Sequence, residues 1–324
     1  MVFLCGFPKS GTTSLAAALR ITEQFNCTTP KETFHFGDDF YGVSSRIGSD
    51  DLPGYMQCFN GDDFPETKYL DATTGYIFSN SALQAIKNNI ASPKLIILIR
   101  NPFDLVEAWH NEMLFSFNED LEDLHIAIEQ SQRRKNGAEV PKKCKSKLFL
   151  DYYQVTSIGT QTAEAIKLFG ECNVLIIKSS DLADSNYISK KLSDFLEINV
   201  SVVIPRLNER KAHRFSWISK LVYEPPIFSS QIYQLRIYFL RRQFRIINFL
   251  KAKLVVTKKK SAGEKNEKFS EKFIIHANNE IQLLAQKLLR IFHGTQAGLR
   301  SGQECANAHI DNIAAFYLFD HGAV

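Results

Sequence analysis

The residues best suited to chemistry lie near the start of the chain, in a loop of small, hydroxylated and basic side chains. Apolar residues 2–7 before this loop indicate a buried strand, and residues 14–20 after it favour a helix. A loop between a strand and a helix N-terminus binds anions, because free backbone N–H groups and the helix dipole point toward it. The candidate binding residues are Lys9, Ser10, Gly11, Thr12, Thr13 and Ser14.

The lysine of this loop is in the wrong place for an ordinary ATP site. Gly6 and Gly11 have P-loop spacing, but an ATP-type loop carries Lys and then Ser or Thr directly after the second glycine. Here Thr12 and Thr13 stand there, and Lys9 precedes the glycine. The pattern therefore favours a phosphoester other than ATP. A P-loop kinase or NTPase, or a chance match in a strand–helix turn, are the alternatives.

Residues 8–15 (PKSGTTSL) resemble the 5'-phosphosulfate loop of sulfotransferases that use 3'-phosphoadenosine-5'-phosphosulfate, PAPS. The resemblance covers about residues 2–215 and, more weakly, a helix near 270–292. It implies that the loop backbone and its hydroxyls hold the 5'-phosphate of PAPS, with PAP as the product and no metal. It also implies a catalytic role for Lys9, which neutralises the bridging oxygen as the sulfuryl group departs.

A second segment, residues 95–104 (LIILIRNPFD), resembles the family's 3'-phosphate motif, in which a strand ends in an arginine. A guanidinium can hold phosphate through paired hydrogen bonds, so Arg100 is the expected ligand. The alternative is that Arg100 only caps the strand and pairs with Asp104. The family carries a serine eight residues after this arginine, where this chain has Ala108. The basic residues that could compensate are Arg206, Arg210, Lys211, His213, Arg214, Lys258, Lys259 and Lys260.

Residues 30–36 (PKETFHF) resemble the segment that supplies the catalytic base in carbohydrate and bacterial sulfotransferases. An attacking hydroxyl must lose a proton, and a carboxylate within hydrogen-bond reach can accept it. Glu32 is the expected base, and His35 is the rival because imidazole titrates near neutral pH. The alternative is a surface carboxylate beside a packed aromatic ring.

Residues 70–76 (LDATTGY) resemble the family's segment beside the acceptor. By that resemblance Asp71 orients the acceptor and Tyr76 contacts it, although Tyr76 could equally belong to the core. The family's lysine is replaced by Ala72, which weakens the case for a sulfated glycosaminoglycan as substrate.

Short, fully apolar segments alternate with helix-forming segments along the chain. Residues 94–100 and 173–178 read as further strands, and residues 158–169 and 270–292 as helices. This alternation predicts an α/β fold with a central parallel sheet flanked by helices, of the P-loop-like sulfotransferase type, in a single domain over 1–324.

Residues 231–260 contain basic side chains and no acidic one. We expect a basic amphipathic helix at about 226–256, followed by a polar loop at about 257–268. Residues 231–256 could contact an anionic membrane surface, cover the donor or simply pack on the domain. We expect no nucleic-acid partner, because no base-stacking module is recognisable.

The bulk composition is that of an ordinary globular protein. The 324 residues are 44% hydrophobic, with a net charge of +4, and the six cysteines include no CxxC pair. No apolar run reaches the length of a membrane span and no signal peptide opens the chain, which predicts a cytoplasmic location.

Taken together, the sequence predicts transfer of a sulfuryl group from PAPS to a hydroxyl or amine of a carbohydrate or small-molecule acceptor. A P-loop kinase or NTPase and a catalytically inactive PAP-binding homologue are the alternatives.

Overall fold

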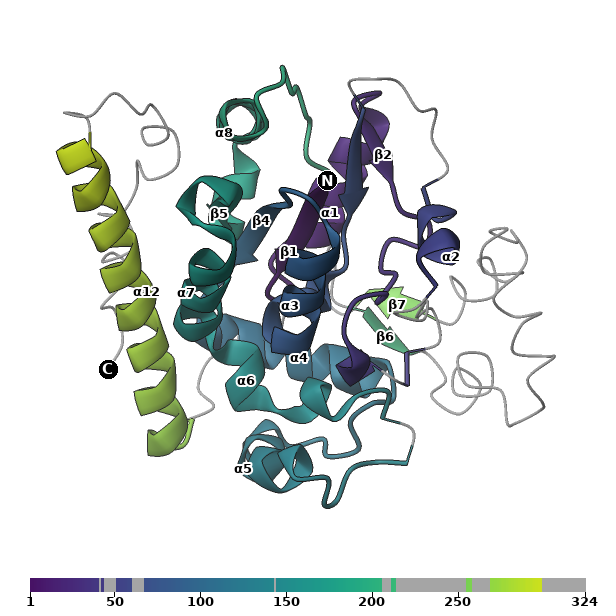
Figure 1. The fold of residues 1–324 in the computed structure, drawn as a ribbon. Coiled ribbons are helices and arrows are strands. Elements are labelled where there is room, and N and C mark those ends of the chain that lie inside the picture. Colours follow the sequence, from purple (N-terminus) through teal and green to yellow (C-terminus); the bar gives the residue numbers. More distant parts are fainter. Residues whose placement is uncertain are drawn as a thin grey trace.

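The computed structural model describes residues 1–40, 42–43, 51–59, 67–142, 144–205, 211–213, 255–257 and 269–298. Its centre is a five-stranded parallel sheet with strand order β2-β3-β1-β4-β5, and helices surround this sheet (Figure 1). The strands of the sheet are β1 (Val2–Gly6), β2 (Phe25–Cys27), β3 (Lys68–Asp71), β4 (Lys94–Ile99) and β5 (Val174–Lys178). The α/β fold with a central parallel sheet is therefore confirmed.

Helices connect these strands. The α-helices are α1 (Thr12–Ile21), α2 (Leu52–Met56), α3 (Asn80–Asn89), α4 (Pro102–Phe115), α5 (Leu124–Lys135), α6 (Tyr152–Thr156), α7 (Ile158–Phe169), α8 (Ser185–Leu196) and α12 (Glu271–Gly298). Short 3-10 turns are η1 (Asp38–Phe40), η2 (Thr74–Phe78), η3 (Lys147–Leu150), η4 (Glu171–Asn173) and η5 (Ser179–Ala183).

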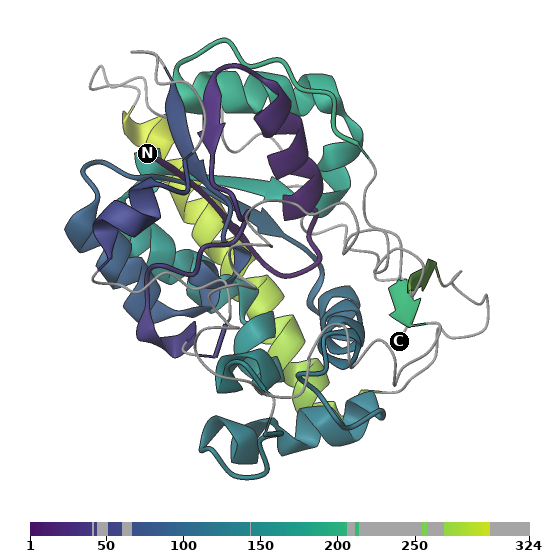
Figure 2. The same cartoon turned by 90° about the vertical axis from the view of Figure 1, so that its right-hand side faces the viewer.

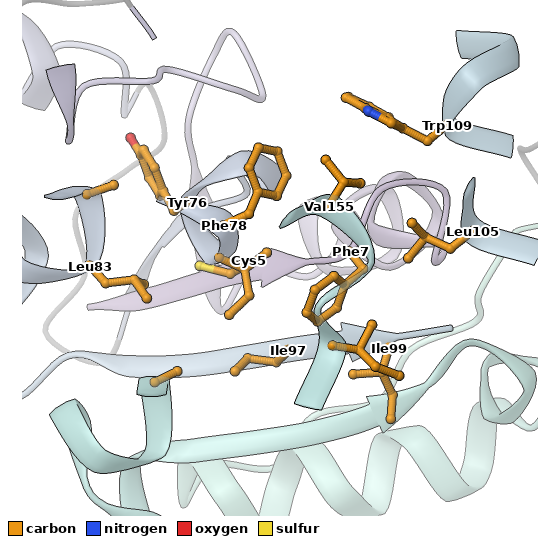
Figure 3. Packing of buried hydrophobic residues seen from close by; sticks show 14 of the residues in the cluster. Cys5, Phe7, Tyr76, Phe78, Leu83, Ile97, Ile99, Leu105, Trp109 and Val155 are labelled. Atoms are coloured by element: carbon orange, nitrogen blue, oxygen red, sulfur yellow. The ribbon is translucent and has the colours of Figure 1, made fainter. Parts of the chain in front are cut away.

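The central strand β1 is apolar throughout because both of its faces are covered. Successive side chains point to opposite faces of a sheet. Phe3 and Cys5 accordingly join the core on one face, whereas Val2 and Leu4 join the core on the other. Figure 3 shows part of the first core, with side chains of the sheet, η2, α3, α4 and α6 packed together. Full burial of each large apolar side chain contributes about 1.5–3 kcal/mol.

The two faces are covered by different helices. α1 and α8 pack on one face, and α3, α4, α7 and α12 contribute to the core on the other. Figure 2 shows α1 and α8 together on one side of the sheet. Because the five strands are parallel, their carboxyl ends lie at the same edge of the sheet. Open α/β sheets bind ligands at this edge.

The expected strands at 2–7, 94–100 and 173–178 and the helices at 158–169 and 270–292 are confirmed as β1, β4, β5, α7 and α12. The short strands β2 and β3 were not anticipated. No helix in the described ranges combines the length and apolarity needed to cross a bilayer.

The expected basic helix at 226–256 and polar loop at 257–268 lie almost wholly outside the described residues. The exception is β7 (Val255–Thr257), which pairs antiparallel with β6 (Lys211–His213). The helical expectation is thus wrong for residues 255–256. Two adjacent valines favour a strand, because β-branched side chains fit a pleated surface better than a helix.

The last described helix, α12, is held closely against α7. A Cβ atom built on Gly159 would lie 2.3 Å from the backbone oxygen of Glu280, so the two backbones touch where this glycine stands. The buried Glu280 carboxylate accepts hydrogen bonds from the Thr160 backbone N–H (2.7 Å) and the Thr160 hydroxyl (2.8 Å). Glu280 thereby satisfies an N–H group of the first turn of α7, which otherwise lacks an intrahelical partner.

The contact at Gly159 predicts the sign of a stability change. In a helix without a close neighbour, Gly→Ala stabilises by about 1 kcal/mol through propensity. We expect Gly159→Ala instead to lower the free energy of unfolding by about 1–3 kcal/mol, because the added methyl overpacks the helix contact. Denaturant unfolding measures this, with the exposed Lys167→Ala on α7 as control. Stabilisation by Gly159→Ala would contradict the packing described here.

Candidate anion and acceptor site

The loop after β1 needs both of its glycines. A Cβ atom on Gly6 would lie 3.0 Å from the Thr12 side chain, so Gly6 permits close packing of α1 on the strand. Gly11 has φ +98°, a left-handed conformation that favours glycine, and a Cβ there would lie 2.3 Å from Leu182 of η5. Gly11 supplies no side-chain cap to α1. The N–H groups at the start of α1 therefore have no side-chain partner at the N-cap.

The Ser10 hydroxyl is the one predicted loop hydroxyl that is buried without a hydrogen-bond partner among the described residues. Its side chain is 0% exposed, and its oxygen has no hydrogen-bond partner. Buried polar atoms without partners are rare in folded proteins and call for an explanation. A phosphate oxygen in the loop would supply the missing acceptor. Of the other predicted hydroxyls, those of Thr12 and Ser14 are buried, whereas Thr13 is exposed.

Two basic side chains flank the loop. The Lys9 backbone is left-handed (φ 61°), and its ammonium group forms an ion pair of 3.1 Å with Glu112 on α4. Arg100, directly after β4, donates a hydrogen bond of 3.0 Å to the Lys9 carbonyl oxygen. A guanidinium carries further N–H donors beyond the one used here. The structure thus brings Lys9 and Arg100, two of the predicted site residues, together at one end of the sheet.

Glu112 was not found by sequence reasoning. It lies on α4 one helical turn after Ala108, the position where the resemblance places a serine. Glu112 faces Lys9 across 103 residues of sequence, and no short motif signals such a pair. The only available signal was its helical spacing from Ala108.

One of the late basic segments lies against α4, the helix that carries Ala108 and Glu112. Strand β6, which contains Lys211 and His213, packs against α4. The remaining compensating candidates (Arg206, Arg210, Arg214, Lys258, Lys259 and Lys260) lie outside the described residues. The replacement of the missing serine by a basic side chain therefore stays a prediction. Of the candidate segments, β6 is the one that the described residues place against α4, the helix that carries Ala108.

Glu32 lies next to the loop, and its side chain is 36% exposed. Its carboxylate accepts hydrogen bonds from the Lys31 ammonium (2.8 Å) and the Thr74 hydroxyl (2.9 Å). Burial raises the pKa of Glu32. The charge of Lys31 and the hydrogen bonds from Lys31 and Thr74 lower this pKa by more than burial raises it, so it lies below the ordinary glutamate value. Glu32 is therefore a carboxylate at neutral pH and can accept a proton.

Lys31 supplies a positive charge that sequence reasoning missed. Its ammonium group donates a hydrogen bond of 3.0 Å to the carbonyl oxygen of Ala72. Ala72 stands where the resemblance places a lysine. A cation is thus present at this position, although it comes from a different segment of the chain.

His35 does not share the accessibility of Glu32. Its side chain is 1% exposed and stacks on the Tyr55 ring, with 4.4 Å between centroids and an interplanar angle of 10°. This arrangement matches the packed-aromatic alternative raised from the sequence. Glu32 is therefore the better placed of the two candidate bases.

Asp71 and Tyr76 are fully buried in the structure. The Asp71 carboxyl accepts hydrogen bonds from Thr33 (3.0 Å), Thr73 (2.6 Å) and Tyr55 (3.1 Å). Burial raises the pKa of Asp71, and these donors offset only part of that effect. The Tyr76 hydroxyl lies 3.1 Å from that of Thr33. Both residues thus hold the segment that carries Glu32, and their predicted contact with an acceptor remains untested.

Among the described residues, no group of three or more His, Cys, Asp or Glu side chains is placed to hold a metal ion. The metal-independence implied by the resemblance stays a prediction.

Comparisons with known proteins identify the fold. No protein-family model and no curated protein matches this chain. A sulfotransferase from Alicyclobacillus acidocaldarius superimposes with a TM-score of 0.53 at 21% identity, covering 64% of this chain and 85% of that one. The chain therefore has the fold of that sulfotransferase.

Two further solved structures match less closely. The sulfotransferase domain from the curacin biosynthetic pathway has a TM-score of 0.37 at 12% identity, covering 61% of this chain and 74% of that one. Mouse sulfotransferase SULT7A1, complexed with PAP, has a TM-score of 0.39 at 17% identity, covering 78% of this chain and 88% of that one.

The unpartnered Ser10 hydroxyl predicts opposite effects on stability and binding. We expect Ser10→Ala to leave the free energy of unfolding unchanged or slightly higher, because it removes a buried unsatisfied group. We expect it to weaken binding of PAP by about tenfold or more, because a hydrogen bond to a charged ligand is lost. Calorimetry and denaturant unfolding measure the two effects. Thr22→Ala, at the opposite end of α1, should leave PAP binding unchanged, and equal affinities of Ser10→Ala and the parent would remove Ser10 from the site.

Proposed function

We propose that this chain is a sulfotransferase that transfers a sulfuryl group from PAPS to a hydroxyl or amine of a carbohydrate or small-molecule acceptor. The observation that carries the proposal is the loop after β1, in which a lysine precedes the second glycine and a buried serine hydroxyl lacks a partner. The fold shared with the Alicyclobacillus sulfotransferase supports it.

The residues around the loop fit a nucleotide with phosphates at two positions. The Ser10 hydroxyl and the N–H groups at the start of α1 suit the 5'-phosphate, because oriented donors and the helix dipole stabilise an anion. Arg100, anchored to the loop through the Lys9 carbonyl, suits the 3'-phosphate.

The proposed reaction is an in-line displacement at sulfur. The acceptor oxygen or nitrogen forms the new bond to sulfur while the bond between sulfur and the bridging oxygen breaks. The electron pair of that bond leaves with the 5'-phosphate of PAP, and the acceptor proton goes to Glu32. Lys9 and the loop amides stabilise the charge that develops on the leaving oxygen, as preorganised donors do for phosphoryl transfer.

Lys9 must exchange partners to perform this role. In the structure its ammonium group is held by Glu112 at 3.1 Å, and both side chains are partly exposed. Ion pairs of this kind are worth little, because water screens them. An incoming phosphosulfate can therefore take Lys9 from Glu112 at small cost.

The deciding experiment incubates the protein with PAPS and fractionated saccharides and metabolites. We expect PAP release together with the addition of one SO₃ group to a single acceptor, followed by mass spectrometry. Calorimetry with PAP and with Mg-ATP tests the alternatives in parallel. Binding of Mg-ATP without PAP would indicate a kinase or NTPase, and PAP binding without transfer to any acceptor would indicate an inactive homologue.

Lys9→Ala tests the leaving-group role. We expect the transfer rate to fall by about 10²- to 10³-fold, because a preorganised donor to the leaving oxygen is lost. The fold should persist, since the Lys9 side chain is partly exposed. The matched control is Lys87→Ala, an exposed lysine of α3. An unchanged rate in Lys9→Ala, with normal circular dichroism, would refute the role.

The pH dependence of transfer tests Glu32. Activity should be lost as pH falls through the lowered pKa of the Glu32 carboxyl. In Lys31→Met we expect this loss at higher pH, because burial then raises the pKa of Glu32 with less opposition. Lys31→Arg keeps the charge and serves as control.

The same pH profile separates Glu32 from His35. Glu32→Gln should lower the rate by about 100-fold or more. The base would be His35 if the pH profile of transfer stayed the same in Lys31→Met and in Glu32→Gln and if activity were lost over the pH range in which imidazole titrates.

A further inference from the structure

A chain of hydroxyl groups joins the anion loop to Glu32. Thr12, the first residue of α1, lies with its hydroxyl oxygen 3.1 Å from that of Thr74 at the start of η2. The Thr74 hydroxyl also lies 2.9 Å from a Glu32 carboxylate oxygen, and the Lys31 ammonium lies 3.3 Å from Thr74. Thr12 and Thr74 are both buried, so water does not readily replace these contacts.

The direction of each hydrogen bond follows from counting protons. The ionised Glu32 carboxylate can only accept, so Thr74 donates its single hydroxyl proton to Glu32. The Lys31 ammonium can only donate. The short contact between Thr12 and Thr74 therefore requires Thr12 to be the donor. In this arrangement the Thr12 proton points away from the loop.

An anion in the loop competes with Thr74 for the hydrogen bond that Thr12 donates. Thr12 can donate to a phosphate oxygen only by turning its proton toward the loop. The Thr74 oxygen would then face the Thr12 oxygen without a proton between them, unless Thr74 donates to Thr12. Thr74 has no second hydroxyl proton with which to keep its bond to Glu32.

We propose that Thr74 is a positioning residue that couples anion binding in the loop to the basicity of Glu32. When a bound anion accepts a hydrogen bond from the Thr12 hydroxyl, the Thr74 hydroxyl donates to Thr12 instead of to Glu32. As a statement about sulfuryl transfer this rests on the proposed function, but the coupling itself needs only an anion in the loop. Glu32 then loses a hydrogen bond to its charged form, which makes it a stronger base. The acceptor proton is thus best received when the donor is in place.

Charged groups surround the hydroxyl relay, which consists of Thr12, Thr74 and Glu32. Lys31 faces Glu32 from the neighbouring residue, and Asp71 lies behind Thr73 on the buried side. Lys9 and Glu112 form the ion pair beside the loop. A bound anion also acts on Glu32 through space, so the test must separate this field from the relay.

Thr74→Val makes that separation, because it removes the hydroxyl and leaves the bound anion and its field in place. Thr74→Ser keeps the hydroxyl and is the matched control. Titration of the Glu32 side-chain carbon by NMR, assigned with Glu32→Gln, gives the carboxyl pKa with and without saturating PAP. We expect PAP to raise this pKa more in the parent and in Thr74→Ser than in Thr74→Val. We also expect the Glu32 pKa of ligand-free Thr74→Val to lie above that of the ligand-free parent and of Thr74→Ser, because Thr74→Val lacks the hydrogen bond to Glu32 whether or not an anion is bound.

The relay would be overturned if PAP changed the Glu32 pKa equally in the parent and in Thr74→Val. It would also be overturned if PAP bound to the parent without changing the Glu32 pKa. If Thr74→Val fails to fold by circular dichroism, Thr74→Ala provides the same comparison with a smaller side chain. Thr12→Val interrupts the relay from its other end.

Pyrophosphate as a second probe separates this inference from the proposed function. If PAP does not bind but pyrophosphate produces the Thr74-dependent change, the relay stands and the sulfotransferase proposal fails. If PAP binds and transfer occurs without a Thr74-dependent change, the function stands and the relay fails. If no anion binds the loop, both are wrong.

Discussion

The parallel pairing of β1 with β4 is the constraint on which the site depends. Every residue of β1 pairs in register with β4, from Val2 opposite Lys94 to Gly6 opposite Leu98. The Phe7 N–H continues the pairing with a bond of 2.9 Å to the Leu98 carbonyl. Because parallel strands end at the same edge, the anion loop and Arg100 must emerge side by side. A slip of one residue would reverse the faces of the apolar side chains and separate these two loops.

Two of the cations around the site are paired with carboxylates. Lys9 faces Glu112, and Lys31 faces Glu32. Each pair is partly exposed, so each contributes little to stability and exchanges partners readily. In the proposed function the site binds a polyanion and then releases it, and cations that are weakly held by carboxylates suit both steps. The two pairs differ in purpose, since one holds the expected leaving-group cation and the other keeps the expected base ionised.

The sequence was sufficient for those features that short segments encode. Apolar runs predicted β1, β4 and β5, and the helix-forming residues after the first loop predicted α1. Anion binding by that loop stays a prediction. The strand β3 was missed because its four residues include Lys68 and Asp71, and it therefore does not read as an apolar run.

The contacts that complete the site join distant segments, and no local pattern encodes them. Glu112 meets Lys9 across 103 residues, and Thr74 meets Thr12 across 62. Asp71 shows the limit in the opposite direction. Its motif suggested a residue that orients the acceptor, and no local pattern showed that its carboxyl is fully buried, because burial depends on tertiary packing.

The docking of α12 also determines when the fold can be completed during synthesis. Phe273, Ala277, Leu284 and Leu288 fill the core on one face of the sheet, and Glu280 reaches an amide of α7 that lies 120 residues earlier in the chain. Ribosomes add about 5–20 residues per second, so α7 is made many seconds before its partner helix. One apolar face of the nascent sheet therefore stays partly exposed until α12 leaves the ribosome. During this time the exposed apolar side chains can bind chaperones or aggregate.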